Sequence, residues 1–156
     1  MKLTLTPISA EAFAPFGTLH ALPVEGARER LDPAMTNHRP EAPLRINLTR
    51  KTPSPLPVTF PALERHPFST QTFVPIDCGR WLVVVTPKTT DGGPDMAGAR
   101  AFLMEPDQGV TYAVDVWHAP LVAFDKPSCF LISIWRDGSA EDEIFADLPE
   151  PLEIGE

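Results

Sequence analysis

Residues 70–86 read TQTFVPIDCGRWLVVVT, two runs of β-branched and aromatic residues separated by a break at Asp77-Cys78-Gly79. Runs of this kind, bounded by Gly, Pro or Asp, predict short β-strands. The second run is apolar at almost every position, which is typical of a strand that is buried on both faces. We therefore expect strands at Thr70 to Ile76 and Trp81 to Thr86, the second one central in its sheet or covered by another layer.

Other segments with strand character surround this pair. Leu44, Ile46 and Leu48 alternate with polar residues, which predicts a half-buried strand. Further strands are expected at residues 99–104, 110–116, 120–124 and 129–135, with an exposed turn at 91–95. The 19 prolines disfavour long helices, because proline donates no backbone hydrogen bond. One short helix is expected after Ser9 as N-cap, and residues 22–43 are expected to form a long loop.

The length and composition indicate one ordinary globular domain. The chain has 156 residues, of which 43% are hydrophobic and 22% charged. A chain of this size buries enough surface to hold a core without disulfides or metals. Many short strands joined by turns favour a barrel or a sandwich, jelly rolls included. We expect a single all-β domain over residues 1–156.

The net charge and the cysteines restrict partners and compartment. A net charge of −8 and a pI near 4.9 argue against nucleic-acid binding, which needs clustered Lys and Arg. Cys78 and Cys129 stand in no metal-binding spacing, so a reducing, cytoplasmic setting is expected. The N-terminus lacks an apolar leader, and the run Trp81 to Val85 is too short to span a membrane. The chain is expected to be soluble and untargeted.

Several reactive side chains share strand faces if their segments are extended. Glu64 and His66 are two residues apart and should point the same way. Gln71 and Phe73 form a second such pair. Tyr112 has the same parity as His118, through Val114 and Val116. These side chains could line one interior.

Two motifs in this region resemble those of the ureidoglycolate lyase (ureidoglycolate hydrolase) family. LERHPFSTQTFVP at 63–75 resembles the family signature L-E-R-H-P-x-x-[ST]-Q-x-F-x-P. DQGVTY at 107–112 and VWHAPL at 116–121 resemble its Q-G-V-x-Y and W-H-x-P-L blocks. The resemblance runs from about Leu44 to the C-terminus, with a weaker similarity over Met1 to Gly17. It implies a cupin-type jelly-roll β-barrel, a homodimer, and release of urea and glyoxylate from ureidoglycolate in allantoin and purine catabolism.

This reaction breaks a C–N bond, so the site needs a carboxylate clamp, a general base and a general acid. The resemblance implies catalytic roles for four residues and substrate-binding roles for five: catalytic His66, Glu64, His118 and Tyr112; substrate-binding Arg50, Gln71, Phe73, Arg136 and Trp117. Imidazole titrates near neutral pH, which suits His66 to act as the general base. The forked guanidinium group of an arginine suits the binding of the substrate carboxylate.

Several of these roles have a structural alternative. Arg50 shares parity with Leu48 and either points inward or is a surface cation at a strand end. His118 acts as acid, binds the ureido group or ends its strand, and Tyr112 donates to an oxyanion or to a buried carbonyl. Phe73 and Trp117 are expected first to pack in the core and only second to form a wall of the substrate site.

The pattern of metal-binding cupins is incomplete, because Glu64, His66, Gln71 and Tyr112 occupy its slots and only one is histidine. No metal is assigned from the residues. If one is present, His66, Glu64 and Gln71 are the expected ligands, and the family resemblance allows a divalent metal such as Ni²⁺. Missing histidines disfavour a metal-dependent isomerase or dioxygenase.

Two departures from the family pattern leave other functions open. The stretch at 27–39 has no convincing equivalent of the family's N-x-G-x-x-x-R, and Trp135 replaces the acid of its D-R-G-G sequence before Arg136. A lyase for a related α-hydroxy or ureido acid is one alternative. A non-catalytic cupin module that binds a small carboxylate is the other.

Overall fold

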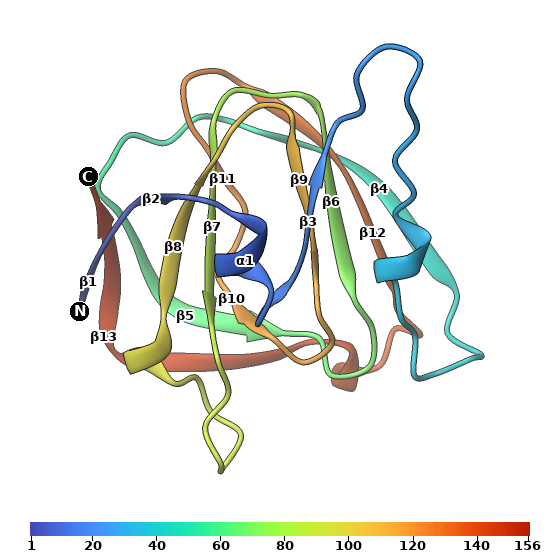
Figure 1. The fold of residues 1–156 in the computed structure, drawn as a ribbon. Coiled ribbons are helices and arrows are strands. Elements are labelled where there is room, and N and C mark those ends of the chain that lie inside the picture. The colour runs from blue at the N-terminus through green and yellow to red at the C-terminus, as the bar shows by residue number, and fades with distance from the viewer.

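The computed structural model describes all residues 1–156 and contains two β-sheets that face each other as a barrel (Figure 1). The eight-stranded sheet has the order β1 (Lys2–Thr4), β13 (Ile144–Gly155), β5 (Val58–Arg65), β10 (Trp117–His118), β7 (Trp81–Thr86), β8 (Arg100–Met104) and β2 (Thr6–Pro7), with β11 (Val122–Ala123) also paired to β7. The five-stranded sheet has the order β3 (Gly17–Ala21), β9 (Gln108–Tyr112), β6 (Gln71–Asp77), β12 (Ser128–Trp135) and β4 (Leu44–Lys51). The expected all-β jelly-roll barrel is confirmed.

The single α-helix, α1 (Ala10–Phe13), begins where the sequence predicts. The Ser9 hydroxyl accepts a hydrogen bond from the Ala12 N–H at 3.1 Å, which satisfies one of the free donors of the first turn. Three 3₁₀ turns complete the helical structure: η1 (Asp32–Ala34), η2 (Met96–Gly98) and η3 (Ala140–Asp142). None of these helices has the length and apolar character needed to cross a membrane.

Strand β7 is buried at every position because it contributes to two cores. Trp81, Val83 and Val85 pack inside the barrel, whereas Leu82 and Val84 pack in a second cluster on the other face of the sheet. The expectation of a central, covered strand is confirmed. β10 and β11 pair along one side of β7 and β8 along the other. The strand thus positions His118 of β10 above the interior core.

The expected burial of one face of β4 is wrong. Leu44, Ile46 and Leu48 are all exposed, the last with 72% of its surface accessible. β4 is the edge strand of the five-stranded sheet and pairs only with β12. Its apolar residues lie on the outer face of that sheet, opposite to Phe130 and the interior core.

The continuous strand expected over 110–116 is also wrong. β9 ends at Tyr112, and Asp115 adopts a φ of 68°, which breaks the extended chain. His118 therefore belongs to β10 in the other sheet. The even spacing between Tyr112 and His118 thus does not place the two side chains on one face of one strand. The two side chains still meet, with ring centroids 4.5 Å apart, because the two sheets converge at this end of the barrel.

Candidate functional site

Glu64, His66 and His118 meet at one end of the barrel. Glu64 lies in β5 and pairs directly with His118 of β10 across the sheet. His66 follows the last residue of β5, and its carbonyl accepts a hydrogen bond from Asp115 N–H at 2.9 Å. The potential ligand atoms of the three side chains lie within 4.8 Å of one another. The expectation that Glu64 and His66 point the same way is confirmed.

Both imidazole rings are held in the same tautomer by backbone carbonyls. His66 Nδ1 lies 3.0 Å from the Asp142 carbonyl, and His118 Nδ1 lies 2.9 Å from the Val116 carbonyl. A carbonyl only accepts, so Nδ1 must carry the proton in each ring. Nε2 of each neutral ring therefore presents a lone pair, and both Nε2 atoms are buried without a hydrogen-bond partner. His118 Nε2 is 3.3 Å from Glu64 Oε1, without hydrogen-bond geometry.

Burial and mutual charge set the protonation states of the cluster. Burial, followed by the charge of His118, lowers the pKa of His66 to about 4. Burial acts to raise the pKa of Glu64, but the contact with His118 and the charges of His66 and Arg136 outweigh it and leave that pKa below its ordinary value. Burial, together with the charge of Glu64, raises the pKa of Tyr112. At neutral pH His66 is neutral, Glu64 is ionised and Tyr112 is protonated.

The depressed pKa of His66 predicts a loss of stability in mild acid. Between the unfolded pKa of 6.5 and the folded pKa of about 4 the unfolded chain binds the extra proton, so the free energy of unfolding falls as pH falls through this window. The full shift corresponds to a loss on the order of 3 kcal/mol. We expect urea denaturation at pH 7 and pH 4.5 to show most of this loss in the wild type. The His66→Gln variant should lose less over the same interval, and an equal loss in both proteins would contradict the assignment.

Gln71, Phe73 and Tyr112 line the interior next to the cluster. Gln71 of β6 pairs with Tyr112 of β9, and the Gln71 Oε1 atom is buried without a hydrogen-bond partner. Phe73 packs in the interior core, with its ring 5.4 Å from that of Tyr112 and 6.4 Å from that of Trp81. The free amide oxygen and the protonated phenol are the polar groups that this wall offers.

Trp117 does not line the site, and its expected role as a substrate wall is wrong. It precedes His118 in β10, so its side chain points to the opposite face of the sheet. There it packs in the second core and donates its indole N–H to the Gly92 carbonyl at 3.1 Å. The Arg65 guanidinium lies over its ring at 5.1 Å.

The two expected clamp arginines lie at opposite ends of the five-stranded sheet. Arg136 follows β12 at the end near the cluster, donates to Glu143 Oε1 at 2.8 Å and has a buried Nε without a partner. Arg50 is exposed and pairs with Cys129 at the other end of β12. With a rise of about 3.3 Å per residue, the end of β4 that carries Arg50 is roughly 20 Å from Leu44. The inward placement of Arg50 is therefore wrong, because the outer face of an edge strand carries it.

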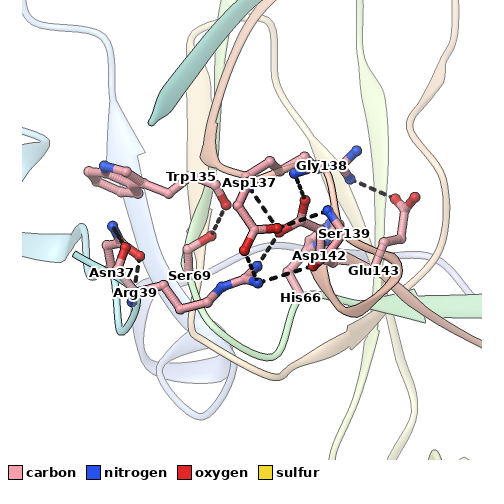
Figure 2. Close-up of polar contacts among 11 residues, drawn as sticks. Asn37, Arg39, His66, Ser69, Trp135, Asp137, Gly138, Ser139, Asp142 and Glu143 are labelled. Carbon is pink, nitrogen blue, oxygen red and sulfur yellow. Dashed lines mark hydrogen bonds and ion pairs between the residues drawn. The ribbon is translucent and has the colours of Figure 1, made fainter. Parts of the chain in front are cut away.

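Arg39 and Asp142 support the site, and sequence reasoning missed both. Asp142 supplies the carbonyl that accepts from His66, and its buried carboxylate forms an ion pair with Arg39 of the 22–43 loop (Figure 2). A backbone carbonyl leaves no signature in a side-chain pattern. Arg39 lies in the stretch 27–39, which departs from the family pattern. That departure was the only feature of the sequence that could have drawn attention to Arg39.

Two hollows open beside the cluster. One of about 420 Å³ is lined by Arg136, Asp142, Glu143 and Phe145, among others. A second of about 140 Å³ includes Glu64 and shares Phe145 as a wall. A further hollow of about 500 Å³ at Arg80 and Asp125 contains no residue of the cluster. The second hollow thus reaches the cluster at Glu64, and the first is lined by Asp142, whose carbonyl contacts His66.

The donor set at the cluster fits a divalent cation. Two Nε2 lone pairs and a carboxylate converge within 4.8 Å, and both nitrogens are buried without another partner. The Nδ1–H of each ring donates to a carbonyl, as is usual for metal-binding histidines. Two histidines and one carboxylate form a common ligand set for first-row divalent metals. His118 thus joins Glu64 and His66, two of the three ligands expected from the sequence, in this set; the third expected ligand is Gln71.

Sequence comparison identifies related proteins over nearly the whole chain. The family model described as ureidoglycolate lyase matches residues 1–151. The chain is 36% identical over 164 residues to a ureidoglycolate lyase of Brucella ovis, covering 97% of this chain and 94% of that one. It is 34% identical over 165 residues to a ureidoglycolate lyase of Burkholderia mallei, covering 96% and 91%.

Solved structures show a more distant similarity. A dTDP sugar isomerase of Desulfovibrio desulfuricans aligns with a TM-score of 0.49 at 17% identity, covering 86% of this chain and 83% of that one. RmlC of Streptococcus suis aligns with a TM-score of 0.47 at 11% identity, covering 63% and 46%.

Proposed function

The chain belongs to the ureidoglycolate lyase family, and we propose that it cleaves ureidoglycolate to glyoxylate and urea at the cluster of Glu64, His66 and His118. The observation that carries this assignment is the convergence of one ionised carboxylate and two histidine side chains, whose buried Nε2 atoms have no hydrogen-bond partner, at one end of a barrel with an apolar core. Such a cluster is costly to bury unless it binds something.

We assign a divalent cation such as Ni²⁺ to Glu64, His66 and His118. The pKa of His66 near 4 supports this, because it makes the ring a weak proton acceptor and a fully deprotonated ligand at neutral pH. A ring this weakly basic is a poor general base at neutral pH, so we do not assign that role to His66. When bound, a divalent cation would supply Lewis-acid chemistry that makes a hydroxyl group more acidic.

The remaining residues handle the substrate carboxylate and one proton. In the reaction the hydroxyl loses its proton, the C–N bond breaks with its electrons moving to the urea nitrogen, and that nitrogen gains a proton as the carbonyl of glyoxylate forms. The Glu64 carboxylate has two oxygens, so one remains to move the proton. Tyr112 keeps its proton and donates a hydrogen bond to the developing oxyanion. Arg136 binds the carboxylate, and the Gln71 amide binds the ureido group.

A coupled assay of freshly prepared ureidoglycolate tests this proposal. We expect glyoxylate and urea in equal amounts, loss of turnover after treatment with a chelator, and recovery on addition of Ni²⁺. The His66→Ala variant should remain inactive under all these conditions. Absence of both products from folded, nickel-loaded protein would contradict the lyase and favour a module that only binds small carboxylates. Turnover that survives complete metal removal would contradict the cation alone.

We further propose that the protein is a cytoplasmic homodimer joined through β4. The exposed side chains of Leu44, Ile46 and Leu48 on this edge strand support an interface, because long apolar edge strands tend to pair with another chain. The free thiols of Cys78 and Cys129 agree with a reducing compartment.

Replacing Leu48 by aspartate is expected to convert this dimer into a monomer, because a buried, unpaired charge opposes association. Sedimentation equilibrium of the wild type and the Leu48→Asp variant measures the change. Val24→Asp, at an exposed residue of the 22–43 loop, is the matched control and should remain dimeric. A wild-type protein that is monomeric at micromolar concentration would contradict the interface.

A further inference from the structure

The turn that carries the Asp142 carbonyl is closed by its own side chains. The Asp142 carboxylate accepts hydrogen bonds from Gly138 N–H at 2.7 Å and Asp137 N–H at 3.3 Å. Ser139 at the start of η3 makes no side-chain cap, so it is these two bonds that tie η3 to the residues before it. The position of the carbonyl that faces His66 therefore depends on where the Asp142 carboxylate is held.

Arg39 fastens both ends of this turn with one guanidinium group. Its Nη1 donates to Asp137 Oδ2 at 2.6 Å and to Ser139 Oγ at 3.2 Å, while its Nη2 forms a short contact with Asp142 Oδ1 (Figure 2). A planar fork with several fixed donors can serve two carboxylates at once, which a lysine ammonium cannot do with the same geometry. The Asp142 carboxylate is 6% exposed, so the loss of this partner would leave a buried charge without a counterion.

Arg39 is itself fixed next to the segment that follows His66. The Asn37 side chain accepts from Arg39 N–H at 2.9 Å and donates to the Arg39 carbonyl at 2.8 Å. The guanidinium lies 4.3 Å from the centroid of the Phe68 ring, and His38 N–H donates to the Phe68 carbonyl at 2.7 Å. The loop is thus docked on the same short stretch of chain that presents His66.

We propose that Arg39 and Asp142 are positioning residues for His66. The ion pair between them holds the Asp142 carbonyl against His66 Nδ1, which keeps the proton on Nδ1 and the Nε2 lone pair directed at Glu64 and His118. Neither side chain belongs to the cluster itself. The consequence for activity rests on the proposed lyase function, whereas the consequence for the His66 tautomer does not.

Ring nitrogen chemical shifts test the tautomer directly. The chain has four histidines, so ¹⁵N-histidine labelling gives four ring systems, and a His66→Gln spectrum assigns the relevant one. In the metal-free wild type at pH 7.5 we expect His66 to be a single Nδ1–H tautomer. In Arg39→Met we expect a mixture with the Nε2–H form, and in Arg39→Lys a smaller change. Arg30→Met is the matched control, since Arg30 pairs only with exposed Asp32 in the same loop and should leave the spectrum unchanged.

Nickel affinity and kinetics supply the second readout. Loss of an outer-shell partner typically weakens metal binding about 10–100-fold, so Arg39→Met should raise the Kd for Ni²⁺ by that factor and lower kcat more than it raises KM. An unchanged His66 tautomer and Ni²⁺ affinity in folded Arg39→Met would overturn the proposal, and Arg39→Lys decides if the first variant does not fold. If the wild type lacks lyase activity while the His66 tautomer still depends on Arg39, the proposed function fails and the positioning role stands.

Discussion

The Glu64→Gln variant is expected to lose about 1,000-fold in kcat/KM for ureidoglycolate, within the range typical for removal of a general acid–base group. Glutamine keeps the size of the side chain but removes its charge and one of its two acceptor oxygens. The cluster then lacks both its anionic ligand and the oxygen that moves the proton. Glu64 is the single carboxylate among the three grouped side chains, and its pKa is lowered, so neither of the other two can replace its charge.

Steady-state kinetics with saturating Ni²⁺ measure this loss, and circular dichroism verifies the fold. Glu153→Gln is the matched control, because Glu153 of β13 only pairs with the exposed Lys2 ammonium. It should retain the activity of the wild type. Less than a tenfold loss in folded, metal-loaded Glu64→Gln would place the proton transfer on another residue.

The Trp81→Ala variant is expected to lose about 4 kcal/mol of unfolding free energy, as is usual when a large aromatic residue is removed from a core. Trp81 is fully buried in β7, and its ring lies 5.1 Å from that of Phe130. Its indole N–H donates to the Gln108 carbonyl at 3.2 Å, so the truncation also leaves a backbone acceptor unsatisfied.

Urea denaturation of Trp81→Ala, Trp81→Phe and Val24→Ala measures this effect. Phenylalanine fills part of the space, so Trp81→Phe should lose less than half as much. Val24 is 78% exposed, and its replacement by alanine should change the unfolding free energy by less than about 0.5 kcal/mol. A loss below about 2 kcal/mol in Trp81→Ala would mean that the core collapses into the vacated volume.

The parts of the fold that depend on local patterns could be predicted from the sequence. The apolar run at Trp81–Thr86 coincides with β7, and the predicted segments at 70–76 and 129–135 correspond to β6 and β12 within one residue at each end. The spacing of Glu64 and His66 likewise predicted that they face the same way. In each case the strand or the side-chain direction is determined by residues that are close together in the sequence.

Features that depend on distant parts of the chain could not be predicted. β13 contains Pro149 and Pro151, which argue against a strand, and only a shift in its pairing with β5 between Asp147 and Leu152 accommodates them. Alternation in β4 suggested a buried face, but a pattern does not reveal that the strand lies at an edge. His118 joins the cluster through the pairing of β10 with β5, two strands that are far apart in the sequence, and the support from Asp142 uses a backbone atom.

The pairing of β13 with two partners has a consequence for biosynthesis. Residues 144–155 pair antiparallel with β5 in the middle of the chain and parallel with β1 at its very start. Leu152 and Ile154 of this strand are fully buried in the second core. Because these residues are translated after β1 and β5, the eight-stranded sheet cannot close before they emerge from the ribosome. Chains in which β13 has not yet been made would keep β1 and β5 as open edges, so chaperones that shield exposed strands should act on this protein until β13 has been synthesised.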